Sequence, residues 1–114
     1  MATSSVTVVN PLYLAPEAPR TIDEVIYDSS IKYGVSEALM RRIITCESQY
    51  QSVQSQIKDP TGPNGREDSW GVVQIHLPDW PEITKEQAMD YNFAVDFLAK
   101  KLSEGKGDLW SCYK

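Results

Sequence analysis

The stretch from Ser36 to Tyr50, SEALMRRIITCESQY, constrains the fold of this chain more than any other segment. Its apolar residues recur at the three- and four-residue spacing of one helix face, and Ser36 is a suitable N-cap. Glu47 follows Met40 by seven positions and Ile43 by four, so it falls on the same face. We therefore predict a helix that ends in a carboxyl group beside an apolar stripe, and this stripe consists of Leu39, Met40, Ile43 and Ile44.

A carboxyl group in that position has chemical consequences. Partial burial disfavours its charged form and raises its pKa. A carboxylic acid that keeps its proton near neutral pH can act as a general acid. From the helix alone, an equally good interpretation is that Glu47 turns to water or pairs with Arg41 or Arg42.

Length and composition fit one small domain. The chain has 114 residues, of which 41% are hydrophobic and 24% charged. A net charge of −5 argues against a nucleic-acid or anionic-membrane partner, because such proteins normally carry a basic surface. No apolar run approaches the roughly 20 residues of a transmembrane helix.

Two cysteines, Cys46 and Cys112, are too few for a typical structural zinc site, and they are either buried thiols or one disulfide. We favour the disulfide, which would join the Glu47 helix to the C-terminal tail. In the chain-entropy model it would stabilise the fold by about 4 kcal/mol. It would also favour an extracytoplasmic location, whether periplasmic, cell-wall or secreted.

The other segments predict a mostly helical α+β domain. Residues 1–20 contain three prolines and no sustained period, so we expect an extended lead segment before a domain of residues 21–114. Capping boxes at Thr21–Glu24 and Thr84–Gln87 open two further helices, and a stronger helix follows from Tyr91 to Ser103.

A small β element is expected after the Glu47 helix. Residues 51–69 are polar and rich in turn-forming residues. Apolar and polar side chains then alternate over Trp70–Leu77, which is typical of a strand. We predict one short strand there, paired in a hairpin with residues near Ser55–Lys58.

The residue types favour carboxyl chemistry. The sequence has no Gly-rich phosphate loop and its only histidine is His76, so we expect no cofactor, no metal and no Ser-His-Asp triad. Glycosidic bond cleavage needs an acid, for which Glu47 is suited, and a group that stabilises an oxocarbenium-like centre. Candidates for that second group are Asp59, Asp68 and Asp79.

Three segments resemble motifs of the lysozyme-like lytic transglycosylases. Thr45–Tyr50, TCESQY, resembles the Glu-Ser-x-aromatic signature at the end of their catalytic helix. Ser69–Ile75, SWGVVQI, resembles their Gly-Leu-Met-Gln-Ile segment, which goose-type lysozymes carry in related form. Asp90–Val95, DYNFAV, resembles the start of a later helix. The resemblance covers about residues 21–113 and implies a lysozyme-like fold, with a small β-hairpin inserted after the catalytic helix.

The resemblance also implies roles for the matched residues. Glu47 would be the catalytic acid. Ser48 would orient Glu47 or a substrate group, Gly71 would let the sugar chain approach the backbone, and Gln74 would line the cleft. The helical wall of that cleft would carry Tyr91 and Asn92. Structural roles in backbone bonding or core packing are the alternative for Ser48, Gln74 and Tyr91.

Two departures from the family pattern bear on the reaction. Ser69 stands where animal lysozymes have an aspartate, and Asp68 would point to the other face of a strand. The C-terminal Ala-Tyr-Asn motif of the family is absent. The first departure favours the single-acid route, in which Glu47 protonates the bridging oxygen and then helps the muramic 6-hydroxyl attack its own anomeric carbon.

The resemblance therefore implies a monomer that cleaves the β-1,4 bond between N-acetylmuramic acid and N-acetylglucosamine in peptidoglycan strands and leaves 1,6-anhydromuramoyl ends. A hydrolase of the same bond, with water positioned by Asp68 or a backbone group, is the first alternative. A non-catalytic glycan-binding or scaffold domain of the same fold is the second.

Overall fold

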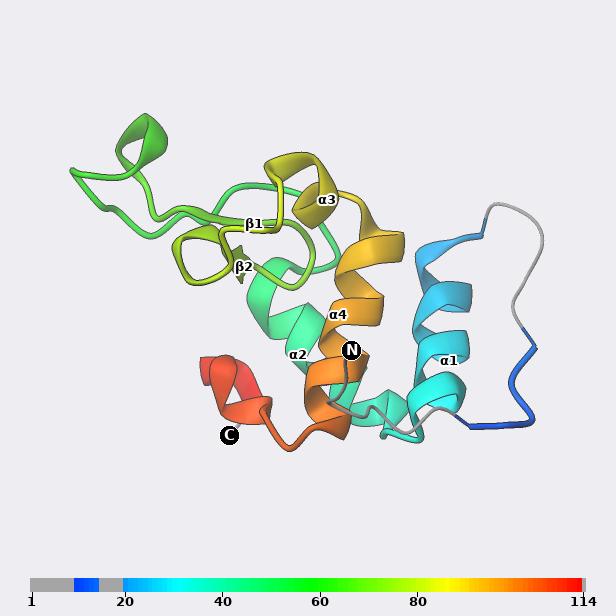
Figure 1. Cartoon of the computed structure of the whole chain (residues 1–114). Coiled ribbons are helices and arrows are strands. Elements are labelled where there is room, and N and C mark those ends of the chain that lie inside the picture. The colour runs from blue at the N-terminus through cyan, green and yellow to red at the C-terminus, as the bar shows by residue number, and fades with distance from the viewer. Residues whose placement is uncertain (1–9, 15–19, 114) are drawn as a thin grey trace.

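The computed structural model describes residues 10–14 and 20–113. Within them the helices are α1 (Ile22–Tyr33), α2 (Glu37–Ser48), α3 (Lys85–Met89) and α4 (Tyr91–Ser103), and the strands are β1 (Ser69–Trp70) and β2 (Ile75–His76). Short 3-10 turns are η1 (Pro63–Gly65), η2 (Leu77–Asp79), η3 (Gly107–Leu109) and η4 (Ser111–Tyr113). The fold is a mostly helical α+β domain, as the sequence predicted (Figure 1).

Most of the predicted lead segment, residues 1–9 and 15–19, lies outside the described residues. In the described part, residues 10–13 form a turn closed by a bond from the Tyr13 N–H to the Asn10 carbonyl, 3.0 Å. The Asn10 N–H donates in turn to the Lys32 carbonyl at the end of α1.

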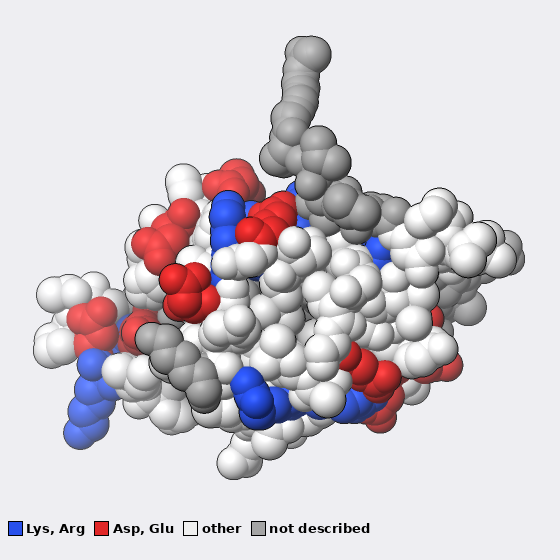
Figure 2. Space-filling view, turned by 90° about the horizontal axis from the view of Figure 1, so that it is seen from below, with Lys and Arg blue, Asp and Glu red and all other residues white. Residues whose placement is uncertain are grey.

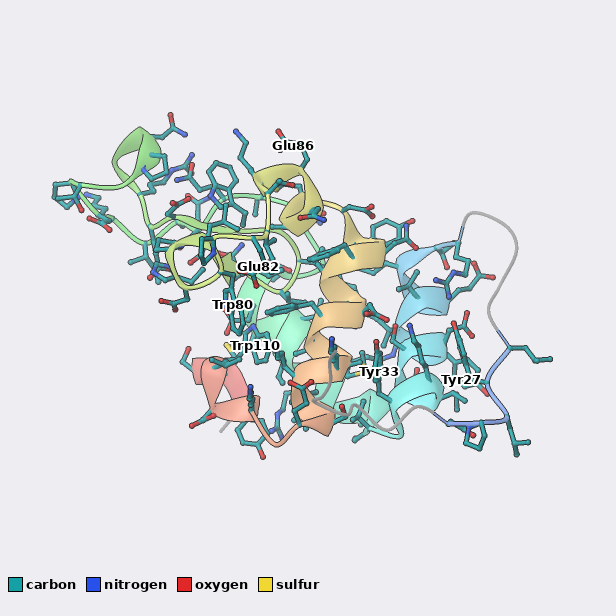
Figure 3. All side chains as sticks on the ribbon, in the orientation of Figure 1. Tyr27, Tyr33, Trp80, Glu82, Glu86 and Trp110 are labelled. Carbon is teal, nitrogen blue, oxygen red and sulfur yellow. A yellow bond between two sulfur atoms is a disulfide. The ribbon has the colours of Figure 1, made fainter. Side chains whose placement is uncertain are left out.

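The start of α1 lies where the sequence predicted it, and both ends of the helix are capped. The Thr21 hydroxyl accepts from the Glu24 N–H, and the Glu24 carboxylate accepts from the Thr21 N–H. Gly34 ends the helix in the left-handed conformation, with φ 65°. The helix lies beside α4, to which the Tyr33 hydroxyl is tied by a 3.0 Å bond to Asp96 (Figures 1 and 3).

The predicted apolar stripe of α2 is the centre of the core. Met40, Ile43 and Ile44 are fully buried, and Ser36 caps the helix by accepting from the Leu39 N–H. The remaining fully buried large side chains come from α1, α4 and the β region, and they are Val25, Ile26, Val72, Val73, Ile75, Val95 and Leu98.

The prediction of one strand over Trp70–Leu77 was wrong. The chain turns instead between two-residue strands, with the Gln74 N–H donating to the Gly71 carbonyl. Both residues have positive φ, 88° at Gly71 and 55° at Gln74, which an alternating pattern of side chains does not report. Val72 and Val73 are both buried inside the turn.

The predicted pairing partner, in contrast, is confirmed for β1. The Ser55 N–H donates to the Ser69 carbonyl at 2.9 Å, and the Glu67 N–H donates to the Ile57 carbonyl at 2.8 Å. Residues 54–57 therefore run antiparallel to residues 67–70 and fix which side chains of that strand face the same way.

The C-terminal tail packs back onto α2 and the β turn. The predicted Cys46–Cys112 disulfide is present, with the two Cα atoms 5.9 Å apart. The buried Trp110 indole N–H donates to the Val73 carbonyl at 2.7 Å. None of the helices within residues 10–14 and 20–113 is long and apolar enough to cross a membrane.

Gly71 gives a test of this packing. A Cβ on Gly71 would overlap the backbone carbonyl of Ala88 in α3, in addition to the strain of a positive φ. We expect Gly71→Ala to cost more than about 3 kcal/mol of unfolding free energy. Gly105→Ala is the matched control, because Gly105 has φ 76° but open space around it, and it should lose only about 1–2 kcal/mol. Equal losses in denaturant unfolding would contradict the packing account.

Candidate active site

Glu47 lies in the last turn of α2, half-buried, where two cavities meet. The loop-side cavity, about 440 Å³, lies against the end of α2 and the residues that follow it, 51 and 53–56. The tail-side cavity, about 300 Å³, is lined by residues around β1 and β2 and by residues 109–111 of the tail. Both volumes fall in the range of small-ligand sites, and both cavities also include Gln74.

The pKa of Glu47 is raised above its ordinary value, in the direction predicted from the sequence. Burial is the main cause, because it disfavours the carboxylate. The charge of Glu67 raises the pKa further, and a hydrogen bond from the Cys112 backbone opposes both effects. Glu47 is therefore a carboxyl group that holds its proton to higher pH than a solvated one.

The alternative that Glu47 pairs with a neighbouring arginine does not describe this structure. Arg41 is bonded to Asp23 and to Glu37. Arg42 donates to the Tyr113 carbonyl in the tail. Both guanidinium groups are thus held by other partners.

Of the other predicted residues, Ser48 and Gln74 line the loop-side cavity with Glu47. The Ser48 hydroxyl lies 2.7 Å from the Val72 carbonyl oxygen and so links α2 to the β turn. The Gln74 side-chain amide donates to the carbonyls of Val53 and Gly71, both at 2.9 Å. Its two N–H groups are used in this way, which leaves the amide oxygen as the atom that it can offer to a ligand.

The other three predicted substrate-binding residues line neither cavity. A glycine is required at position 71, because φ is positive there and a side chain would overlap the backbone of α3. The Tyr91 hydroxyl donates to the Arg20 carbonyl ahead of α1. Asn92 is bonded to Asp90, the N-cap of α4, through both its backbone N–H and its side-chain amide. Each of these three has a structural role in the described fold.

Two of the aspartates predicted as a second active-site group are bound elsewhere. Asp59 is partly exposed, and hydrogen bonds from the Thr61 hydroxyl and backbone lower its pKa. The Asp68 carboxylate accepts from the Trp70 indole N–H at 2.6 Å. Asp79 does line the tail-side cavity.

Four other polar residues of the tail-side cavity were not predicted as site residues from the sequence. They are Glu67, Ser69, His76 and Ser111. The Ser69 hydroxyl lies 3.0 Å from Nδ1 of His76, its partner across the strand pair. The pairing of residues 54–57 with 67–70, together with the i, i+2 spacing of Glu67 and Ser69, is the signal from which these two residues could have been predicted as neighbours in the site.

Aromatic side chains extend the tail-side cavity toward α4. A pocket of about 40 Å³ shares Gln74, His76 and Trp110 with it and reaches Trp80 and Phe97. Trp80 and Trp110 lie one near the other between the tail and the β region (Figure 3), and each packs edge-on against the Phe97 ring. Trp110 and Phe97 are buried, so the partly exposed Trp80 is the ring of this group that is suited to contact with a sugar.

Charge is mixed on the face of the molecule seen in Figure 2, where acidic and basic side chains are interspersed over the described residues and do not form a broad basic patch. Within the described part of the chain no cluster of three His, Cys, Asp or Glu residues could hold a metal ion.

Comparison with known proteins gives no match to a family model, to a curated protein or to a solved structure.

The raised pKa of Glu47 predicts a dependence of stability on pH. The ordinary pKa is 4.5, and the folded value is higher, so between the two values the folded chain binds more protons and loses stability as pH rises. Glu47→Gln has no charge to bury and should gain stability relative to wild type between about pH 4 and about pH 7. Thermal unfolding by circular dichroism at both pH values measures this gain. A wild-type advantage that grows toward neutral pH would contradict it.

Proposed function

We propose that this chain is a lytic transglycosylase that cleaves peptidoglycan strands at the β-1,4 bond between N-acetylmuramic acid and N-acetylglucosamine. The observation that carries the proposal is the position of Glu47, a half-buried acid of raised pKa at the junction of two cavities. The proposed substrate and the proposed lysozyme-like fold come from the resemblance of the three motifs to lytic transglycosylases. The disulfide supports an extracytoplasmic site of action, and we propose that the chain acts there as a monomer.

The two cavities are suited to a glycan strand that crosses Glu47. A polymer cut in its interior needs room on both sides of the broken bond, and Glu47 lines both the loop-side and the tail-side cavity. Gln74 lines both cavities, and its amide oxygen can accept a hydrogen bond from a sugar hydroxyl or acetamido N–H.

In the proposed reaction Glu47 gives its proton to the bridging oxygen. The bond from the anomeric carbon to that oxygen breaks, and its electron pair leaves with the departing N-acetylglucosamine. The muramic 6-hydroxyl then attacks the anomeric carbon, and its proton passes to the Glu47 carboxylate. The acid is regenerated without a water molecule, and the new end is a 1,6-anhydro sugar.

A hydrolase of the same bond is the second candidate. The carboxylates of Glu67 and Asp79 in the tail-side cavity favour it, because either could position a water molecule. Asp68 is less suited to that role than the sequence implied, since its carboxylate is bonded to the Trp70 indole.

Replacement of the acid tests the proposal. We expect Glu47→Gln to release muropeptides from purified sacculi about 10²- to 10⁴-fold more slowly than wild type, because the leaving oxygen is no longer protonated. Binding of chitooligosaccharide should persist in the variant. The matched control is Glu86→Gln, an equal charge change at an exposed position in α3 (Figure 3), and it should keep full activity.

Mass spectrometry of the released muropeptides separates the candidate reactions. A transglycosylase gives ends lighter by one water molecule than those of a hydrolase. If wild type and Glu47→Gln are equally inert while both bind chitooligosaccharide, the chain is a glycan-binding domain and the enzymatic proposal is wrong.

A further inference from the structure

We infer that Glu67 is a second catalytic carboxylate of this site, and that its charge stabilises the positive charge that develops at the anomeric carbon when the leaving oxygen is protonated. The inference rests on the proposed function of Glu47. The motifs did not identify the group that stabilises the oxocarbenium-like centre. The residues that line the tail-side cavity point to Glu67 for that role.

The pairing ahead of β1 holds Glu67 at the cavity. The Glu67 N–H donates to the carbonyl of Ile57, and Ile57, Glu67 and Ser69 all line the tail-side cavity with Glu47. The carboxylate of Asp68, between Glu67 and Ser69, is bonded instead to the Trp70 indole N–H. Glu67 therefore lies on the β wall of the cavity into which Glu47 projects from α2.

The backbone of Glu67 is fixed while its carboxylate is free. Its N–H donates to the Ile57 carbonyl at 2.8 Å, and its carbonyl accepts from the Gln54 side-chain amide at 3.3 Å. Within residues 10–14 and 20–113 the carboxylate itself has no hydrogen bond or ion pair, although the residue is partly buried. A carboxylate on a fixed backbone that keeps its acceptor capacity is suited to a cationic centre in a ligand.

The surrounding charges give the two glutamates different roles. The titratable groups that face this cavity are Glu47 from α2, Glu67 ahead of β1, His76 from β2 and Asp79 from η2, while the tail contributes Leu109, Trp110 and Ser111. The charge of Glu67 helps to keep the proton on Glu47. Glycosidic cleavage commonly uses one carboxyl group as the acid and a second carboxyl group to stabilise the oxocarbenium-like centre.

The proposed step balances without a proton on Glu67. Glu47 protonates the bridging oxygen, the bond to the anomeric carbon breaks, and the electron pair leaves on the oxygen. The Glu67 carboxylate attracts the positive charge left at the anomeric carbon. Attack by the 6-hydroxyl then returns a proton to Glu47, so no proton passes to or from Glu67 in this step.

The test is a kinetic comparison on glycan strands freed from sacculi by an amidase. We expect Glu67→Gln to lower kcat about 10²- to 10³-fold with little change in KM. The pH profile provides a readout that a structural role would not change. Without the Glu67 charge the pKa of Glu47 falls, so the alkaline limb of kcat/KM should move to lower pH.

Two further variants control for folding and for net charge. Glu67→Asp keeps the carboxylate and should restore part of kcat and the original alkaline limb. Asp68→Asn makes the same charge change one residue away, keeps an oxygen acceptor for the Trp70 indole, and should behave as wild type.

Each outcome decides between the claims. If Glu47→Gln is inactive but Glu67→Gln keeps the wild-type kcat and the wild-type alkaline limb, the role of Glu67 is wrong and the proposed function stands. If Asp68→Asn lowers kcat as much as Glu67→Gln, the effect is one of net charge and the role of Glu67 is also wrong. If wild type and Glu47→Gln are equally inert, the proposed function itself fails.

Discussion

The last turn of α2 is held from two sides, and the candidate site depends on this arrangement. Cys46 is bonded covalently to Cys112 in the tail, and Ser48 is hydrogen bonded to the Val72 carbonyl in the β turn. The tail and the turn are joined in turn by the buried bond from the Trp110 indole to the Val73 carbonyl. Glu47 lies between Cys46 and Ser48, so the tail and the turn that remove water from its carboxyl group are also those that fix its backbone.

The local backbone carries strain at the same place. Gln49 and Gln74 both have positive φ, 52° and 55°, and both line the loop-side cavity. Non-glycine residues in this region cost free energy and persist where the surrounding packing over-determines them. Here Gln49 ends α2 immediately after the site, and Gln74 ends the turn that presents its amide to both cavities. The strained positions therefore set the shape of the cavity walls around Glu47.

The helices were predictable from local chemistry, because Thr21, Ser36 and Gly34 specify helix ends and the apolar stripe of α2 specifies its buried face. The β region was not, because its form depends on positive φ values and on the approach of α3 to Gly71. Glu47 was found because it interrupts a periodic stripe.

Glu67 was missed because its side of the chain is set by long-range pairing with residues 54–57, which its own neighbours in the sequence do not reveal. Tyr91 and Asn92, for which the resemblance implies a place on the cleft wall, have hydrogen bonds within the fold, to the Arg20 carbonyl and to Asp90.

The central claim is that the packing around α2 raises the pKa of Glu47, and a direct titration of that carboxyl group tests it. Carbon-13 NMR of the side-chain carboxyl signals across a pH series, with the Glu47 signal assigned by its absence in Glu47→Gln, gives the value. The account predicts a pKa above the ordinary 4.5, with burial as the main cause. A Glu47 carboxyl that titrates at or below 4.5 would show that it is solvated and would contradict the account.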